Sequence, residues 1–221
     1  MHILLTDVLT CPRCGPEFGL MVLADRMEER RVVEGRLGCA NCRESYPVHD
    51  ALADLRLPGA AESGDAGPSM EEDAEASVRL AALMGLSGAI GMALVAGPGA
   101  RQAAAVHALV PELEVIAAAE RPDALPPRAA GVSRIAAGPG GLPLRGGGLR
   151  GAALTGGADE ARLREGLRVL APGARLLVEP AAADTAERLR ALGAEVLLDQ
   201  AGAVVARAPG RPVELRHNAV R

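Results

Sequence analysis

The chain has 221 residues and a formal net charge of −4 at pH 7, a balance that argues against a nucleic-acid-binding protein. Hydrophobic residues make up 49% of the chain but aromatic residues only 1%, so its core has to be packed from alanine, valine and leucine. The N-terminus shows neither a basic segment nor a long apolar run, and we therefore expect a cytoplasmic protein without a signal peptide.

Residues 80–100 are uncharged and long enough to be considered as a membrane span. They contain several glycines and Pro98, however, which fit the end of a helix followed by a buried strand better than a continuous apolar helix. The sequence therefore predicts no membrane span.

Four cysteines are arranged as two C-x-x-C pairs separated by 24 residues: Cys11, Cys14, Cys39 and Cys42. Two such turns brought together present four thiolates at tetrahedral spacing, which suits Zn²⁺. Disulfides would need an oxidising compartment, for which no export signal is present. An iron–thiolate site has the same ligands, but the aromatic shell expected of a rubredoxin is missing. We predict a closed, structural zinc site, with no open position for catalysis.

Between the two pairs, Gly19–Ala24 and Arg31–Leu37 have the pattern of two strands in a hairpin. The charged segment Asp25–Arg30 between them is predicted to be a solvated connection.

The residues after the second pair carry a family resemblance. The paired C-x-x-C motifs, followed by Tyr46-Pro47-Val48, Asp50 and Asp54-Leu55, resemble the zinc-ribbon family of small methyltransferase-activator proteins. The family pattern is close to Y-P-V-x-D-G-I-P-D-L, and here Ala51-Leu52-Ala53 replaces its Gly-Ile-Pro. The resemblance implies a zinc ribbon over residues 1–57. It also implies binding to methyltransferase partners, and similar ribbons occur fused to methyltransferase domains.

Residues 58–69 have the composition of a linker, rich in glycine, proline and acidic residues. Ser69 and Glu72 fit a capping box that would start a helix reaching to about Leu86. We accordingly predict an α/β domain over residues 70–210 and a tail over residues 211–221.

Strands and helices are predicted to alternate through the α/β domain. The expected strands are 92–96, 113–118, 132–136, 152–155, 175–178, 195–198 and 203–208, the last two as an antiparallel hairpin. The expected helices are 102–109, 159–170 and 184–192. This order, with Leu142-Pro-Leu144 and the R-V-L-A-P-G-A-R-L-L-V segment over residues 168–178, resembles a class I S-adenosylmethionine-dependent methyltransferase. The fold class is thus α/β: a β-rich zinc ribbon, then a Rossmann-like sheet with a C-terminal antiparallel hairpin.

A cofactor site of that kind would lie at the glycine turn after strand 92–96. Gly97 and Gly99 would lie against the cofactor. The family's carboxylate that binds the ribose hydroxyls aligns with Ala119, or with Glu120 if the alignment is shifted by one residue. Four other positions have lost the family's residues: Val95, Arg101, Gly138 and Arg150. Each lost polar contact costs about 1–3 kcal/mol, so S-adenosylmethionine is expected not to bind usefully.

These substitutions favour a non-catalytic protein, an accessory or structural subunit that acts through protein contacts. The alternative is an active S-adenosylmethionine-dependent methyltransferase with a divergent cofactor site, in which Gly97, Gly99 and Glu120 hold the cofactor. We expect a protein partner or larger assembly and no nucleic acid. The ribbon is expected to dock on its own α/β domain, because a short tether gives a high effective concentration.

Overall fold

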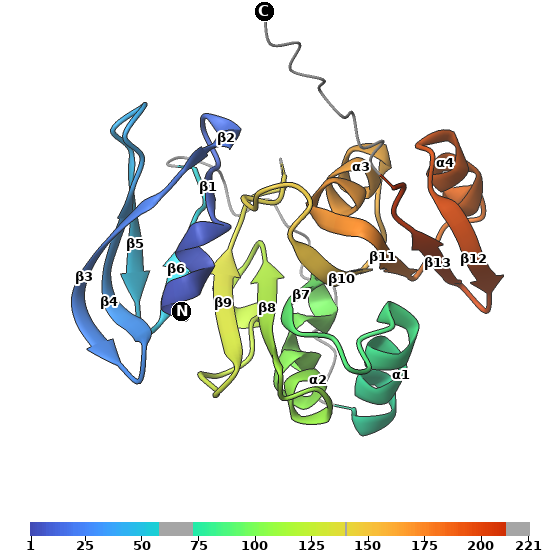
Figure 1. Ribbon diagram of the computed structural model, residues 1–221, viewed down its shortest axis with the longest axis horizontal. Coiled ribbons are helices and arrows are strands. Elements are labelled where there is room, and N and C mark those ends of the chain that lie inside the picture. The colour runs from blue at the N-terminus through green and yellow to red at the C-terminus, as the bar shows by residue number, and fades with distance from the viewer. Residues whose placement is uncertain (58–72, 140, 211–221) are drawn as a thin grey trace, which may run out of the picture.

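The computed structural model describes residues 1–57, 73–139 and 141–210, whose arrangement is drawn in Figure 1. Its main sheet has eleven strands in the order β12-β13-β11-β10-β7-β8-β9-β6-β5-β4-β3. Strands from the first 57 residues form one end of this sheet, and strands from residues 91–207 form the other. The ribbon and the α/β region therefore share one continuous sheet.

The ribbon consists of η1 (Ile3–Asp7), β1 (Thr10–Cys11), β2 (Gly15–Gly19), β3 (Met21–Glu28), β4 (Arg31–Gly38), β5 (Ser45–His49) and β6 (Leu52–Asp54). The predicted hairpin is present, but the solvated connection predicted over Asp25–Arg30 is wrong, because β3 continues to Glu28. Only Glu29 and Arg30 turn, both at positive φ. Since β3 is the outer edge strand, its charged residues reach solvent without leaving the strand.

A second tight hairpin joins β5 to β6. Asp50 and Ala51 adopt φ values of 45° and 58°, as a two-residue turn of this hand requires. Ala51 stands where the ribbon family pattern has glycine, and a left-handed alanine costs about 1 kcal/mol. The hairpin nevertheless forms, with Val48 opposite Ala53.

The two parts of the chain join where β6 pairs in parallel with β9 (Val132–Ala136). Ala53 lies opposite Ile135, and the backbone N–H of Leu55 donates to the carbonyl of Ala136 at 2.8 Å. Ala53, Leu55 and Ile135 are all fully buried. The ribbon is thus docked on the α/β part of its own chain, as expected.

An ion pair next to this junction also links the two parts. The Arg31 guanidinium from β4 donates to both carboxylate oxygens of Glu114, at 2.9 and 2.8 Å, and to the carbonyl of Val132. The Ser133 hydroxyl donates to the same carboxylate at 2.6 Å. The Arg31 and Glu114 side chains are only 12% and 13% exposed, so neither charge has much access to water.

The α/β part consists of α1 (Ala74–Met84), β7 (Gly91–Ala96), η2 (Pro98–Gln102), α2 (Ala103–Leu109), β8 (Leu113–Ala119), η3 (Pro122–Ala124), β9, β10 (Leu149–Thr155), α3 (Glu160–Val169), β11 (Leu170–Glu179), α4 (Thr185–Ala191), β12 (Glu195–Gln200) and β13 (Ala203–Arg207). Strands β9, β8, β7, β10 and β11 are parallel neighbours, and β13 runs antiparallel to both β11 and β12. The α/β class and the C-terminal antiparallel hairpin are confirmed.

Helix starts follow local capping chemistry. Asp73 caps α1 by accepting from the N–H of Glu75, whereas the predicted capping pair Ser69 and Glu72 lies outside the described residues. Asp159 caps α3 in the same way. The helix predicted over residues 159–170 ends one residue early, at Val169, because Leu170 is the first residue of strand β11.

Two hydrophobic clusters cover the faces of the sheet. One packs α1 and α2 against β7 and β8, with Leu80, Met84 and Val106 fully or almost fully buried. The other combines α3 and α4 with ribbon residues, so Leu9 and Leu163 belong to one core. None of the helices in the described parts of the chain is long and apolar enough to cross a membrane.

Candidate functional site

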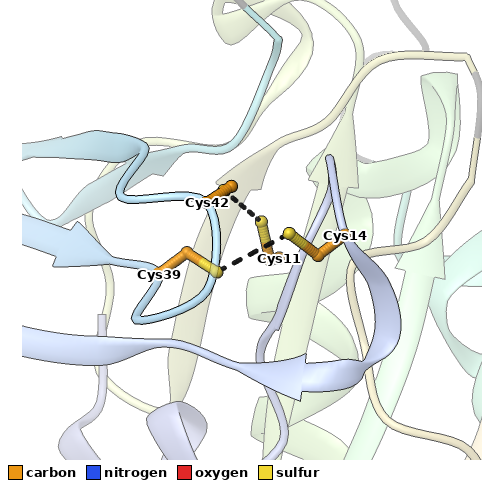
Figure 2. A group of neighbouring side chains, drawn as sticks. All are labelled: Cys11, Cys14, Cys39 and Cys42. Atoms are coloured by element: carbon orange, nitrogen blue, oxygen red, sulfur yellow. Dashed lines mark hydrogen bonds between the residues drawn. The ribbon is translucent and has the colours of Figure 1, made fainter.

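The four cysteines come together between the ends of β1, β2 and β4 (Figure 2). Their sulfur atoms all lie within 4.8 Å of one another, with Cys11–Cys42 at 3.7 Å and Cys14–Cys39 at 3.9 Å. A tetrahedral zinc site with Zn–S bonds of about 2.3 Å has sulfur–sulfur edges of about 3.8 Å. The four thiols therefore fit a tetrahedral metal ion, and the predicted convergence of the cysteines is confirmed.

Two polar side chains surround the sulfurs. The Tyr46 hydroxyl is 3.4 Å from the Cys11 sulfur, and the Asn41 amide donates to the Cys14 sulfur at 3.3 Å. Burial raises the pKa of Tyr46, so this hydroxyl keeps its proton and can donate to the sulfur. Burial also raises the pKa of the Cys11 thiol, but hydrogen bonds from Tyr46 and nearby backbone N–H groups lower it to about 7. The surroundings thus favour a thiolate at Cys11. The Glu44 backbone N–H lowers the pKa of Cys42, but burial and hydrogen bonds with the other three thiols raise it to about 12.

Strands β7 and β10 are parallel neighbours at the centre of the sheet. From β7 the chain adds β8 and β9 on one side, and it then adds β10 and β11 on the other side, so the strand order reverses between β7 and β10. Ligands of open α/β sheets bind at the carboxyl ends of the strands at such a point. Here Gly97 and Gly99 pack directly on Thr155, the last residue of β10. The Gly99 N–H donates to the Thr155 hydroxyl at 2.7 Å, and that hydroxyl donates to the Ala96 carbonyl at 2.8 Å. The glycine turn is therefore closed by the protein itself.

The tightness of this turn gives a stability prediction. A Cβ on Gly97 would lie 2.0 Å from the Thr155 carbonyl oxygen, and its φ of +95° is unfavourable for other residues. We expect Gly97→Ala to lower the free energy of unfolding by more than about 2 kcal/mol in urea denaturation. Gly138→Ala is the control, since no atom lies within 4 Å of the added Cβ. Equal effects of the two substitutions would contradict the closed turn.

Arg101 extends from η2 across to the loop after β8. Its Nη2 donates to the carbonyl oxygen of Asp123 in η3, while its Nε is buried without a hydrogen-bond partner among the described residues. The side chain thus bridges the loops that follow two adjacent strands. A ligand seated over β7 and β8 would have to displace it.

Glu120 lies directly after β8, at the same carboxyl edge. The charge of Glu120 acts on Arg162 in the first turn of α3, which the sequence did not single out. Burial lowers the pKa of Arg162, and the carboxylates of Glu120, Asp159 and Glu165 oppose the shift. The carboxylate proposed for a ribose thus has a cationic neighbour from its own chain.

The other positions at which the sequence departs from the methyltransferase pattern are spread over both edges of the sheet. Val95 is fully buried within β7, and Gly138 follows β9 at the carboxyl edge. Arg150 instead lies at the amino end of β10, where its Nε donates to the Ile90 carbonyl. Counting Arg150 among the lost cofactor contacts was therefore wrong, because it is on the opposite edge from Thr155.

A pocket of about 440 Å³ opens beside this turn. It extends from Gly99 and Thr155 to Glu179 at the end of β11, and α1 and the β12–β13 turn form its sides. Neither Glu120 nor Gly97 lines it. Thr155, which contributes to both the turn and the pocket, was missed because a strand-ending threonine has no distinctive sequence signal.

Comparison with known families concerns the ribbon. The family model described as Trm112p-like protein matches residues 2–50, the segment that contains all four cysteines. The predicted resemblance of the ribbon is therefore confirmed. The chain matches no curated protein.

Several solved structures resemble part of this chain. One is the Burkholderia thailandensis 1,6-didemethyltoxoflavin-N1-methyltransferase with bound S-adenosylhomocysteine: 19% identity, TM-score 0.47, covering 62% of this chain and 80% of that one. Another is the complex of the Haloferax volcanii Trm112 methyltransferase activator with a putative methyltransferase: 14% identity, TM-score 0.43, covering 64% and 100%. At such identities and TM-scores, these similarities carry no conclusion about what this chain does.

Proposed function

We propose that this is a zinc-dependent, methyltransferase-like protein without methyl-transfer activity, which serves as a subunit through protein contacts. The observation that carries the proposal is the closed turn, in which the Thr155 hydroxyl accepts a hydrogen bond from the Gly99 N–H. Arg101 adds to it by lying across the loops that follow β7 and β8. The division into a ribbon over residues 1–57 and an α/β domain over residues 70–210 belongs to the same proposal.

Zinc is the metal we propose for Cys11, Cys14, Cys39 and Cys42. Four thiolates in a closed tetrahedron are a common structural zinc site. Such a site leaves no coordination position for substrate, so the ion holds the ribbon folded and does no chemistry. Thiolate ligands also suit a reducing compartment, in keeping with a cytoplasmic protein.

We expect no binding of S-adenosylmethionine because of the residues at the carboxyl ends of the parallel strands. Val95 and Gly138 offer no carboxylate there. Each unmade hydrogen bond to a polar ligand removes about 1–3 kcal/mol of affinity. Together with displacement of Arg101, these losses take binding out of the micromolar range.

The outer edge of the ribbon supports the protein-contact part of the proposal. Because β6 is engaged by β9, the free edge of the ribbon is β3. Phe18, Met21, Leu23 and Met27 lie on or next to this edge and are 40–59% exposed. An edge strand with exposed apolar side chains is a surface for pairing with another chain.

Affinity purification from the native host, followed by sizing of the complex, tests this role. We expect a defined protein partner that is lost from Met21→Asp/Leu23→Asp. It should be retained by Ile90→Asp, which changes another exposed apolar residue, far from β3 in the chain. A monomer without any partner, together with measurable methyl transfer, would contradict the proposal.

One observation favours a second candidate, an active methyltransferase. The pocket beside Gly99 and Thr155 leaves room for a small molecule at the edge where this fold type binds ligands. In that case Gly97, Gly99 and Glu120 would hold the cofactor, with only Gly99 of the three lining the pocket, and Arg101 would have to be displaced.

A further inference from the structure

The outer edge strand of the sheet, β3, has an uncharged first half. Strand β4 is its one neighbour among the described strands (Figure 1). Over residues 21–24 the pairing with β4 is regular, with Met21 opposite Gly38 and Ala24 opposite Gly35. The other side of this segment therefore presents backbone N–H and C=O groups that the described strands leave unpaired.

The second half of β3 carries the features that keep an edge strand from pairing further. Its register with β4 shifts between Ala24 and Arg26, an irregularity of the β-bulge kind. Beyond it, the Arg26 guanidinium donates to the Glu28 carboxylate at 2.6 Å, and both side chains reach solvent. Charges and bulges protect edge strands against pairing with another chain. The segment 21–24 has neither, so it is the part of β3 that is open to another strand.

The side chains of this segment divide between the two faces of the sheet. Val22 lies opposite Leu37, which is fully buried, and packs against the core that the ribbon shares with α3 and α4. Met21 and Leu23 alternate with Val22, lie on the other face, and are 59% and 53% exposed. A strand that pairs here has to match two exposed apolar side chains on one face and a valine on the other.

We propose that this strand is the same segment of a second copy of the chain, antiparallel and related by a twofold axis at Val22. Met21 then lies opposite the partner's Leu23, Leu23 lies opposite the partner's Met21, and Val22 lies opposite the partner's Val22. Opposite residues of an antiparallel pair share a face, so the exposed apolar side chains cover one another and the valines continue the core. Homo-oligomers most often use such a self-complementary twofold contact.

The charges and side-chain sizes along β3 favour this register over its neighbours. With the axis at Leu23, Met21 would lie opposite the partner's Asp25. With the axis at Met21, Leu23 would lie opposite the partner's Gly19, which has no side chain to cover it. Only the axis at Val22 pairs Met21 with Leu23 twice and keeps Asp25 away from both. This inference rests on the proposed subunit role and deepens it by naming the partner of the β3 edge.

Sedimentation velocity of the zinc-loaded full chain, from about 1 μM to about 300 μM, tests the proposal. We expect a monomer–dimer equilibrium with a Kd of about 10 μM, as suits a contact of few residues. Leu23→Glu places a carboxylate opposite the partner's Met21 at two symmetric positions and should weaken the dimer about tenfold. Met27→Glu is the matched control and should leave the Kd unchanged, because Met27 is a 47% exposed residue of β3 beyond the irregularity.

A charge pair tests the register. Met21→Lys should weaken the dimer about as much as Leu23→Glu does. The double variant Met21→Lys/Leu23→Glu places each new ammonium opposite the partner's new carboxylate and should recover most of the lost affinity. A monomer at every concentration would overturn the proposal. So would a dimer that Leu23→Glu leaves intact, or a double variant that dimerises no better than the single ones.

The outcome separates this inference from the subunit role. A monomer that binds a different protein through β3 would refute the second copy and leave the subunit role standing. A dimer with measurable methyl transfer would do the reverse.

Discussion

Removal of the metal should unfold the ribbon and weaken the whole protein. A unit of about 57 residues with Phe18 and Tyr46 as its only aromatics has little core of its own, and structural zinc supplies on the order of 10 kcal/mol of folding free energy. Strand β6 pairs with β9, so unfolding of β6 would leave β9 as an unpaired edge strand of the sheet. We therefore expect chelation to unfold residues 1–57 first and to lower the melting temperature of the α/β part.

Tyr46 provides a specific probe for this experiment. It is the only tyrosine, the chain has no tryptophan, and its hydroxyl lies 3.4 Å from the Cys11 sulfur. Tyrosine fluorescence should change on chelation and on Cys39→Ser but not on Arg13→Ser, which alters an exposed residue between two ligands. Elemental analysis should give one zinc per chain. Iron in the purified protein, or an unchanged fluorescence and melting temperature after chelation, would contradict this account.

Breaking the Arg31–Glu114 pair should be the most damaging single change at the junction. Arg31→Met leaves the Glu114 carboxylate, only 13% exposed, without its bidentate partner. Removing one member of a buried pair costs about 3–5 kcal/mol, whereas exposed pairs are worth at most about 1 kcal/mol. Urea denaturation of the full chain measures the loss.

Two further variants sharpen this test. Arg36→Met on the same strand changes an exposed arginine and should have little effect. Arg31→Met/Glu114→Met removes both charges and should recover most of the lost stability. A loss below about 1 kcal/mol for Arg31→Met would mean that the pair behaves as an exposed one. A double variant as unstable as the single would show that packing rather than charge is responsible.

Local patterns in the sequence were enough to predict the cysteine cluster and most of the α/β elements. The spacing of the cysteines fixes two turns, and strand Val132–Ala136 was predicted with its observed limits because it follows Gly131 and carries Val132, Ile135 and Ala136. Strand β3 was cut short at Ala24, because an edge strand with charged residues lacks the alternation that signals a strand.

Non-local features could not be predicted in this way. Strand β6 has three residues, and nothing in Leu52–Asp54 indicates pairing with a strand about 80 residues later. Thr155 closes the glycine turn from 56 residues away along the chain. Arg150 was misplaced because a motif aligned by sequence does not reveal which end of its strand reaches the site.

Calorimetric titration of S-adenosylmethionine into the zinc-loaded protein tests the central claim most directly. The closed turn and Arg101 predict no saturable heat at cofactor concentrations up to about 1 mM, an affinity weaker than about −4 kcal/mol. Stoichiometric binding with a micromolar Kd, weakened by Glu120→Gln, would contradict the account and establish the methyltransferase alternative in its place.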